Sequence, residues 1–311
     1  MMDRMDLILP QFGIFAQGTS AHHFLEFDLR AGVTPADAVA SFRRLRTPDV
    51  SAGGVNLVVA FGSDAWRAVA PAEAPASLAG FREVVGPGGR HAPATQHDAW
   101  LWFSGSRSDV TWDHARAAVR AVRDVASLAS ERAAAPYHDG RDITGFVDGT
   151  ANPPVRRAAA AAIVPPGEPG AGGSFVLAMR WIHDLEAFEQ LSVEEQERVI
   201  GRTKPDSIEL SDASKPPTAH IARVEIEDDD GEELPIFRRS VPYGTVQEHG
   251  LYFVAFSADP SRFDRMLARM FGTSGDGMHD RLTDFSHPVS GGIYFAPSLN
   301  ALNELAGPEE D

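Results

Sequence analysis

Short apolar runs and amphipathic segments alternate along the first 140 residues. Runs of strand length occupy three stretches, at 24–29, 55–61 and 100–103. Apolar residues recur at helical spacing over 111–126, and Thr34 followed by Pro35 has the residue types that start a helix. The pattern therefore predicts strands alternating with helices in this part of the chain.

The rest of the chain repeats this alternation of strands and helices. Strands are predicted at 175–181 and 251–256, and helices at 193–200 and 261–271. The aromatic-rich strands near residues 100 and 251 are each followed by a short polar turn and a helix rich in Arg and Ala. This similarity indicates two related α+β halves, which we assign to residues 1–140 and 141–311.

Four further segments carry local predictions. Residues 158–173 are rich in Ala, Pro and Gly and lack periodicity, which predicts a mobile surface loop. The acidic run 227–233 is expected to be a solvated turn, and the tail 307–311 to be disordered. Residues 221–226 alternate apolar and polar side chains, which predicts a strand.

The balance of charged residues narrows the choice of partners. The 311 residues include 28 Lys and Arg against 44 Asp and Glu, which gives a net charge of −16. Such a surplus repels phosphate backbones and anionic lipids, so nucleic acids and membrane surfaces are poor candidate partners. No stretch reaches the roughly 18 apolar residues that span a bilayer. The N-terminal sequence does not resemble a signal peptide, and we expect a cytoplasmic protein.

The composition also limits the cofactor chemistry. Hydrophobic residues make up 43% of the chain, enough to build a core that could enclose a cofactor as large as a porphyrin. There are no cysteines, which excludes disulfides, cysteine-held iron–sulfur clusters, thiolate-ligated haem and cysteine nucleophiles.

Residues 142–153 (DITGFVDGTANP) are the most informative segment for chemistry. Two glycines bracket an apolar pair and one carboxylate, Asp148, and glycine lets backbone approach a ligand that a side chain would block. Asp148 is therefore expected to project from a loop. The alternative is an ordinary turn in which the aspartate bonds its own backbone.

Two other segments carry candidate functional groups. His220 follows the rigid stretch 216–219 (PPTA), which would hold an axial metal ligand firmly. Arg238 and Arg239 stand between apolar residues shortly before a predicted buried strand. Each feature also has a simpler interpretation, because lone histidines and strand-end arginines are usually ordinary surface or core residues.

Taken together, these segments resemble the dye-decolorizing peroxidase family, especially its compact bacterial branch. Residues 145–150 match the family's GxxDG distal motif, and 200–210 match the stretch that precedes the haem ligand. Residues 214–220 are similar to the proximal segment and 238–244 to the distal arginine segment. The order is that of the family, and the resemblance runs from about residue 8 to 299.

The resemblance implies two ferredoxin-like halves with antiparallel sheets, and haem b bound in the C-terminal half between helices and sheet. Asp148 would be the distal acid–base, Arg238 the distal cation and His220 the proximal iron ligand. Arg202 would contact a haem propionate, which suits the bidentate geometry of a guanidinium. The other residues expected around the haem are Gly145, Phe146, Val147, Gly149, Thr150, Leu251 and Phe253.

Two positions need separate treatment. The resemblance also places Ser240 among the catalytic residues, at a position where many relatives carry asparagine and where it would help to order the distal water. Its hydroxyl can still hydrogen-bond but reaches less far. Asp284 is expected to accept a hydrogen bond from the second nitrogen of His220, although Asp280 could serve instead.

The expected substrates are hydrogen peroxide and a small-molecule electron donor, and the family resemblance favours a homo-oligomer. Because such a haem pocket leaves little room for a bulky dye, electrons would arrive through oxidisable surface aromatics. The candidates, each of which is also an ordinary core residue by composition, are Trp181, Tyr243, Tyr252 and Tyr294.

Two other functions are compatible with the same motifs. One is a protein that removes iron from haem or modifies the porphyrin, and the other is a haem-binding sensor or carrier that needs no distal base. A peroxidase with aspartate as its base is expected to work best in mild acid, because the neighbouring Arg238 lowers the pKa of Asp148 although burial opposes it.

Overall fold

The structure is a computed structural model that describes residues 8–45 and 54–304. The tail prediction for 307–311 therefore lies outside the described residues. The N-terminal half contains β1 (Ala21–Leu29), α1 (Pro35–Arg43), β2 (Asn56–Phe61), α2 (Ser63–Val69), β3 (Val84–Val85), β4 (His91–Ala92), β5 (Ala99–Gly105), α3 (Ser108–Val122) and β6 (Ala126–Ala134).

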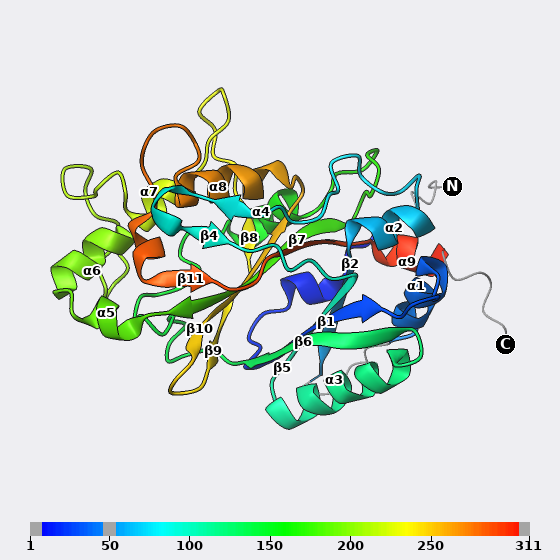
Figure 1. Cartoon of the computed structure of the whole chain (residues 1–311). Helices are drawn as coiled ribbons and strands as arrows, with labels where there is room; N and C mark the ends of the chain where they lie inside the picture. Colours follow the sequence, from blue (N-terminus) through cyan, green and yellow to red (C-terminus); the bar gives the residue numbers. More distant parts are fainter. Residues whose placement is uncertain (1–7, 46–53, 305–311) are drawn as a thin grey trace.

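The remaining elements form the C-terminal half (Figure 1). They are α4 (Val155–Ala162), β7 (Ser174–His183), α5 (Leu185–Glu189), α6 (Val193–Ile200), α7 (His220–Val224), β8 (Phe237–Arg238), β9 (Val241–Gly244), β10 (His249–Ser257), α8 (Ser261–Phe271), β11 (Ser286–Pro288), β12 (Gly292–Ala296) and α9 (Leu299–Glu304). The mixed α+β class is confirmed.

The main sheet is antiparallel and runs through both halves. Its order is β6-β1-β5-β2-β12-β7-β10-β8, with β11 paired to β7 and β9 paired to β10. If only the four strands of each half that lie on this path are counted, both halves have the order fourth, first, third, second, which is the ferredoxin-like arrangement predicted from the family resemblance. The boundary between residues 140 and 141 stays a prediction.

The two half-sheets meet at both ends. Phe61 of β2 pairs with Phe295 of β12, and at the other end the amide of Ala135 donates to the carbonyl of Pro242 (3.2 Å). Side chains that face inward form one core cluster, and helices cover the outward faces in a second cluster. Figure 1 shows α7 and α8 above the strands of the C-terminal half, and α3 below those of the N-terminal half.

A carboxyl group lies inside this barrel-like core. Glu26 on β1 is 4% exposed and accepts hydrogen bonds from the hydroxyls of Tyr252 (2.9 Å) and Tyr294 (3.1 Å), which belong to the other half. Trp100 donates its indole N–H to the Tyr252 hydroxyl (3.1 Å). Burial raises the pKa of Glu26 above its usual value.

Several local predictions are confirmed. Thr34 caps α1 by accepting from the amide of Asp37, and helices α6 and α8 have the predicted bounds. Residues 227–233 form an exposed turn closed by a bridge between Glu227 and Glu233.

Two local predictions are wrong, and one strand was not predicted. Residues 221–226 were expected to form a strand, but α7 covers most of them because Arg223 docks on α8 as part of a helix, with its Nε donating to the carbonyl of Arg269 (3.1 Å). The expected loop 158–173 begins inside α4, whose alanines bury one face. Strand β6 was not predicted, because it consists mostly of alanine, serine and charged residues, which are not typical of strands.

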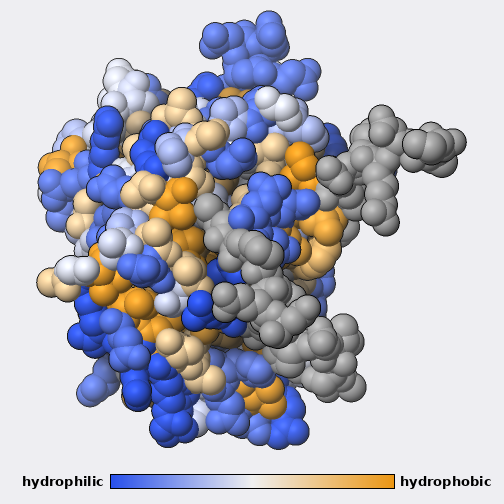
Figure 2. Space-filling model, turned by 90° about the vertical axis from the view of Figure 1, so that its right-hand side faces the viewer, coloured by the Kyte–Doolittle hydropathy of each residue, from blue (hydrophilic) through white to orange (hydrophobic). Residues whose placement is uncertain are grey.

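On the face that Figure 2 shows, hydrophilic side chains predominate and apolar groups are scattered between them. Among the described residues, no helix has the length and apolar character needed to cross a bilayer.

Candidate functional site

A large apolar cavity lies on the outer face of the C-terminal half-sheet. Side chains alternate along β10, so that Tyr252 and Val254 face the barrel interior, whereas Leu251 and Phe253 face the cavity. The opposite wall comes from α8 through Met266, Leu267 and Met270. With its open mouth included, the cavity has about 1330 Å³ of atom-free space.

His220 enters this cavity from the first residue of α7. Its Nδ1 donates to Oδ2 of Asp280 (2.6 Å), and Asp280 is fully buried. The other oxygen of Asp280 accepts from the amide of Leu282 (2.9 Å), which fixes the carboxylate in the short helical turn Arg281–Asp284. Within the described residues Nε2 of His220 has no hydrogen-bond partner, so this nitrogen is available to a ligand in the cavity.

The expected partner of His220, Asp284, is therefore replaced by Asp280. Asp284 instead accepts from Nη2 of Arg90 (2.5 Å), which also contacts Nε2 of His279 (2.6 Å). Asp284 does not line the cavity, because it points toward the β3–β4 hairpin that carries Arg90.

Asp148 lies in a loop, as predicted, and lines the cavity. Its Oδ1 accepts from the amide of Gly149 (2.7 Å), so the backbone-bonded turn that was the alternative interpretation is present as well. Burial raises the pKa of Asp148, and the positive charge of Arg238 opposes that rise without cancelling it. Burial thus outweighs the lowering of the Asp148 pKa by Arg238, on which the predicted optimum in mild acid depends.

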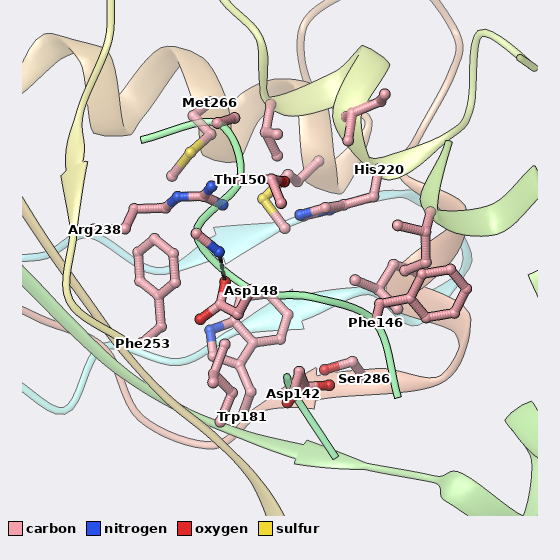
Figure 3. A pocket seen from close by; sticks show the side chains of 18 of the residues that line it. Asp142, Phe146, Asp148, Thr150, Trp181, His220, Arg238, Phe253, Met266 and Ser286 are labelled. Atoms are coloured by element: carbon pink, nitrogen blue, oxygen red, sulfur yellow. Dashed lines mark hydrogen bonds between the residues drawn. The ribbon is translucent and has the colours of Figure 1, made fainter. Parts of the chain in front are cut away.

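Arg238 reaches the same cavity from β8. Asn152 ties this strand to the Asp148 loop, since its side-chain amide donates to the Arg238 carbonyl (2.9 Å) and accepts from the Arg238 amide (2.8 Å). Figure 3 shows the guanidinium of Arg238 and the imidazole of His220 pointing toward one another across the cavity, with Asp148 beside them. The role of Asn152 was not predicted, although it belongs to the singled-out segment 142–153.

The cavity walls fit a flat, largely apolar group with acidic substituents. Two buried donors that line it, Nε of Arg202 and Nε1 of Trp181, have no hydrogen-bond partner in the part of the chain that the structure describes. Such orphan donors are costly unless a ligand supplies acceptors. Arg202 is otherwise held by the carbonyl of Ser207 (3.0 Å) and by Glu209 (3.4 Å). The residues present therefore suit a porphyrin that carries carboxylates.

Most of the predicted site residues meet here. Those that line the cavity are Phe146, Val147, Asp148, Gly149, Thr150, Arg202, His220, Arg238, Leu251 and Phe253.

Gly145 and Ser240 do not line this cavity. Gly145 has φ +89°, and a Cβ there would lie 2.6 Å from Cε of Lys204, so the glycine serves the turn and its packing. Ser240 accepts from the amide of Val254 (3.3 Å) and faces a neighbouring cavity.

A buried polar chain at one end of the cavity was not predicted. His183 contacts Asp142 through Nε2 (3.2 Å) and Ser286 through Nδ1 (2.7 Å). Burial opposes ionisation of Asp142, but His183 and Thr144 together hold its pKa below the usual value. These residues are far apart in sequence, and no local spacing connects them.

The four aromatic candidates for electron transfer are all buried. Trp181 and Tyr243 are 7% exposed, and Tyr252 and Tyr294 lie in the barrel interior. Their expected place at the surface is therefore wrong, and the core interpretation holds for each.

Comparison with known proteins agrees with this architecture. A family model described as "Dyp-type peroxidase, N-terminal" matches residues 11–133, and one described as "Dyp-type peroxidase, C-terminal" matches residues 139–301. The dye-decolorizing peroxidase of Rhodococcus erythropolis is 36% identical over 294 residues, covering 92% of this chain and 86% of the relative.

Solved structures give the same result. A Dyp-type peroxidase protein from Shewanella oneidensis superimposes with a TM-score of 0.90 at 32% identity, covering 97% of this chain and 99% of that one. A variant of DypB from Rhodococcus jostii RHA1, in complex with heme, has a TM-score of 0.86 at 32% identity, with coverage of 96% and 98%. The chain belongs to the Dyp-type peroxidase family.

Proposed function

We propose that this protein is a haem peroxidase that binds haem b on the imidazole of His220 and reduces hydrogen peroxide with electrons from a small-molecule donor. The observation that carries the proposal is the meeting of an imidazole, a carboxylate and a guanidinium at one apolar cavity. Family membership supports the peroxidase activity, and the haem complex of the Rhodococcus jostii relative supports the cofactor.

The residues that would hold the cofactor are His220, through its free Nε2, and Arg202, whose unpaired Nε suits a propionate. Haem, when bound, supplies the redox-active iron at which the O–O bond of peroxide is cleaved. The buried carboxylate of Asp280 holds the Nδ1–H of His220, which fixes the ring and increases the basicity of Nε2.

Across the cavity from His220, Asp148 accepts the proton of one peroxide oxygen and returns it to the other peroxide oxygen, which leaves as water. Arg238 stabilises the negative charge that develops on the peroxide oxygens. The overall reaction consumes one hydrogen peroxide, two electrons and two protons, and two donor molecules each lose one electron. Asp148 must be ionised to accept the proton, so its raised pKa sets a lower pH limit on activity.

The first test is an absorption spectrum of the haem-loaded protein, compared with that of His220→Ala. We expect a Soret band of ferric histidine-ligated haem that the substitution abolishes. Arg238→Ala should then lower kcat/KM for peroxide by about 10²–10³-fold, and Asp148→Ala by less, because charge stabilisation is the larger contribution. Equal, negligible losses in both variants would remove the catalytic proposal.

Two alternatives give different results in the same samples. With haem, peroxide and a donor dye, a peroxidase oxidises the dye and leaves the porphyrin intact, whereas a haem-handling protein changes the porphyrin. A sensor or carrier would behave the same after Asp148→Ala. Homo-oligomerisation, a cytoplasmic location and the route by which electrons reach the haem stay predictions.

A further inference from the structure

A second cavity adjoins the proposed haem cavity. The two share Asp148, Gly149 and Arg238 as a common wall. The second cavity is also lined by Arg239, Ser240, Tyr137 and Phe237, and it has about 780 Å³ of atom-free space with its mouth included.

Arg239 brings a positive charge into this cavity without an anion to balance it. Its guanidinium lies 5.4 Å from the ring centroid of Trp102. This contact uses one face of the guanidinium and leaves the N–H donors at its edge available for hydrogen bonds. No carboxylate within the described residues forms an ion pair with Arg239. Burial alone lowers the pKa of Arg239 to about 10, and no acidic side chain counteracts it.

The other lining residues do not neutralise this charge. Arg141 is already engaged by Asp139 (2.8 Å) and by backbone carbonyls. Burial, as the largest cause, lowers the pKa of His22 to about 4, so His22 is neutral near pH 7. Asp148 is the single acidic residue in the lining, and it lies on the wall beside Arg238.

We propose that the second cavity binds a small aromatic carboxylate, with its carboxylate on the guanidinium of Arg239 and its ring against Tyr137 and Phe237 at the cavity wall. A half-buried cation without a counter-charge favours an anionic ligand, and a guanidinium fork matches a carboxylate. The binding site does not depend on haem. The further proposal that an anionic reductant binds in this cavity, next to Asp148 and Arg238, rests on the proposed function.

The test is calorimetric titration of the haem-loaded protein with benzoate and with benzamide, its neutral isostere. We expect one benzoate per chain, at least tenfold weaker binding of benzamide, and no change in the Soret band. Arg239→Gln should weaken benzoate binding at least tenfold, and Arg239→Lys should retain part of the affinity. The control is Arg116→Gln on the exposed face of α3, which removes the same charge outside both cavities and should leave the affinity unchanged.

Three outcomes would overturn the proposal. These are equal binding of benzoate and benzamide, unchanged affinity in an Arg239→Gln protein that keeps its Soret band and thermal unfolding midpoint, and a Soret shift that follows benzoate saturation. The last outcome would mean that the anion binds at the iron. Failure here leaves the proposed peroxidase function untouched, because His220-dependent haem binding is measured by its own absorption band.

Discussion

The hydrogen bond between His220 and Asp280 should set the reduction potential of the bound haem. Both oxygens of the fully buried Asp280 accept, one from His220 (2.6 Å) and one from Leu282 (2.9 Å). An asparagine side chain has a single acceptor oxygen and no negative charge, so Asp280→Asn loses the charge-assisted bond to His220. That bond contributes about 1.5–3 kcal/mol, which corresponds to about 65–130 mV for one electron if it favours the ferric state.

The assay is a spectroelectrochemical titration of the ferric/ferrous couple in the haem-loaded wild type and in Asp280→Asn. The potential should rise, because the negative charge that stabilises the more oxidised iron is removed. The matched control is Asp284→Asn, which loses its pairing with Arg90 but leaves the His220 bond in place and should shift the potential far less. An unchanged or lowered potential in Asp280→Asn, or an equal shift in the control, would refute the reasoning.

Three further predictions concern stability and local order. Asp148→Asn should stabilise the haem-free protein at pH 7, because the folded-state pKa of Asp148 is raised and its ionisation destabilises the fold as pH rises through that value. The gain should vanish below about pH 4 in thermal unfolding scans, where the aspartate is protonated in both states. Gly201→Ala should lower the free energy of unfolding in denaturant by about 1–3 kcal/mol, since Gly201 has φ +96° and a Cβ would lie 2.5 Å from Ile221. The control is Gly231→Ala, at φ +81° with open space around it, which should lower that free energy less. Equal losses in the two variants would contradict the clash. Arg90→Ala should speed hydrogen exchange at residues 279–284, whereas Arg67→Ala, which removes three bonds to another loop, should leave exchange there unchanged.

Elements with local start and stop signals were predictable from the sequence. Helix α6 begins at a capping box formed by Ser192 and Glu195 and ends at Gly201 in the left-handed conformation. The apolar spacing within α8 marks that helix in the same way. The motif residues Asp148, His220 and Arg238 were found through family resemblance, and all three line one cavity.

What the sequence could not supply depends on contacts between distant segments. Asp280 and Asp284 are four residues apart, and the position of the Arg281–Asp284 turn, whose first amide donates to the Thr218 carbonyl (2.9 Å), decides which carboxylate faces His220. The chain from Asp142 through His183 to Ser286 likewise joins three separate segments. Helix α7 forms because Arg223 packs on α8, which an alternating pattern of apolar residues does not reveal.

The carboxyl group of Glu26 makes the two halves interdependent. It comes from β1, but the phenols that bond to it come from β10 and β12, across the internal repeat. A fragment that ended between the halves would separate this buried acid from both phenols and leave it only the more distant imidazole of His97 (3.7 Å). We therefore expect the two halves to unfold as one cooperative unit, in which the half without the cofactor cavity helps to keep the other half in shape.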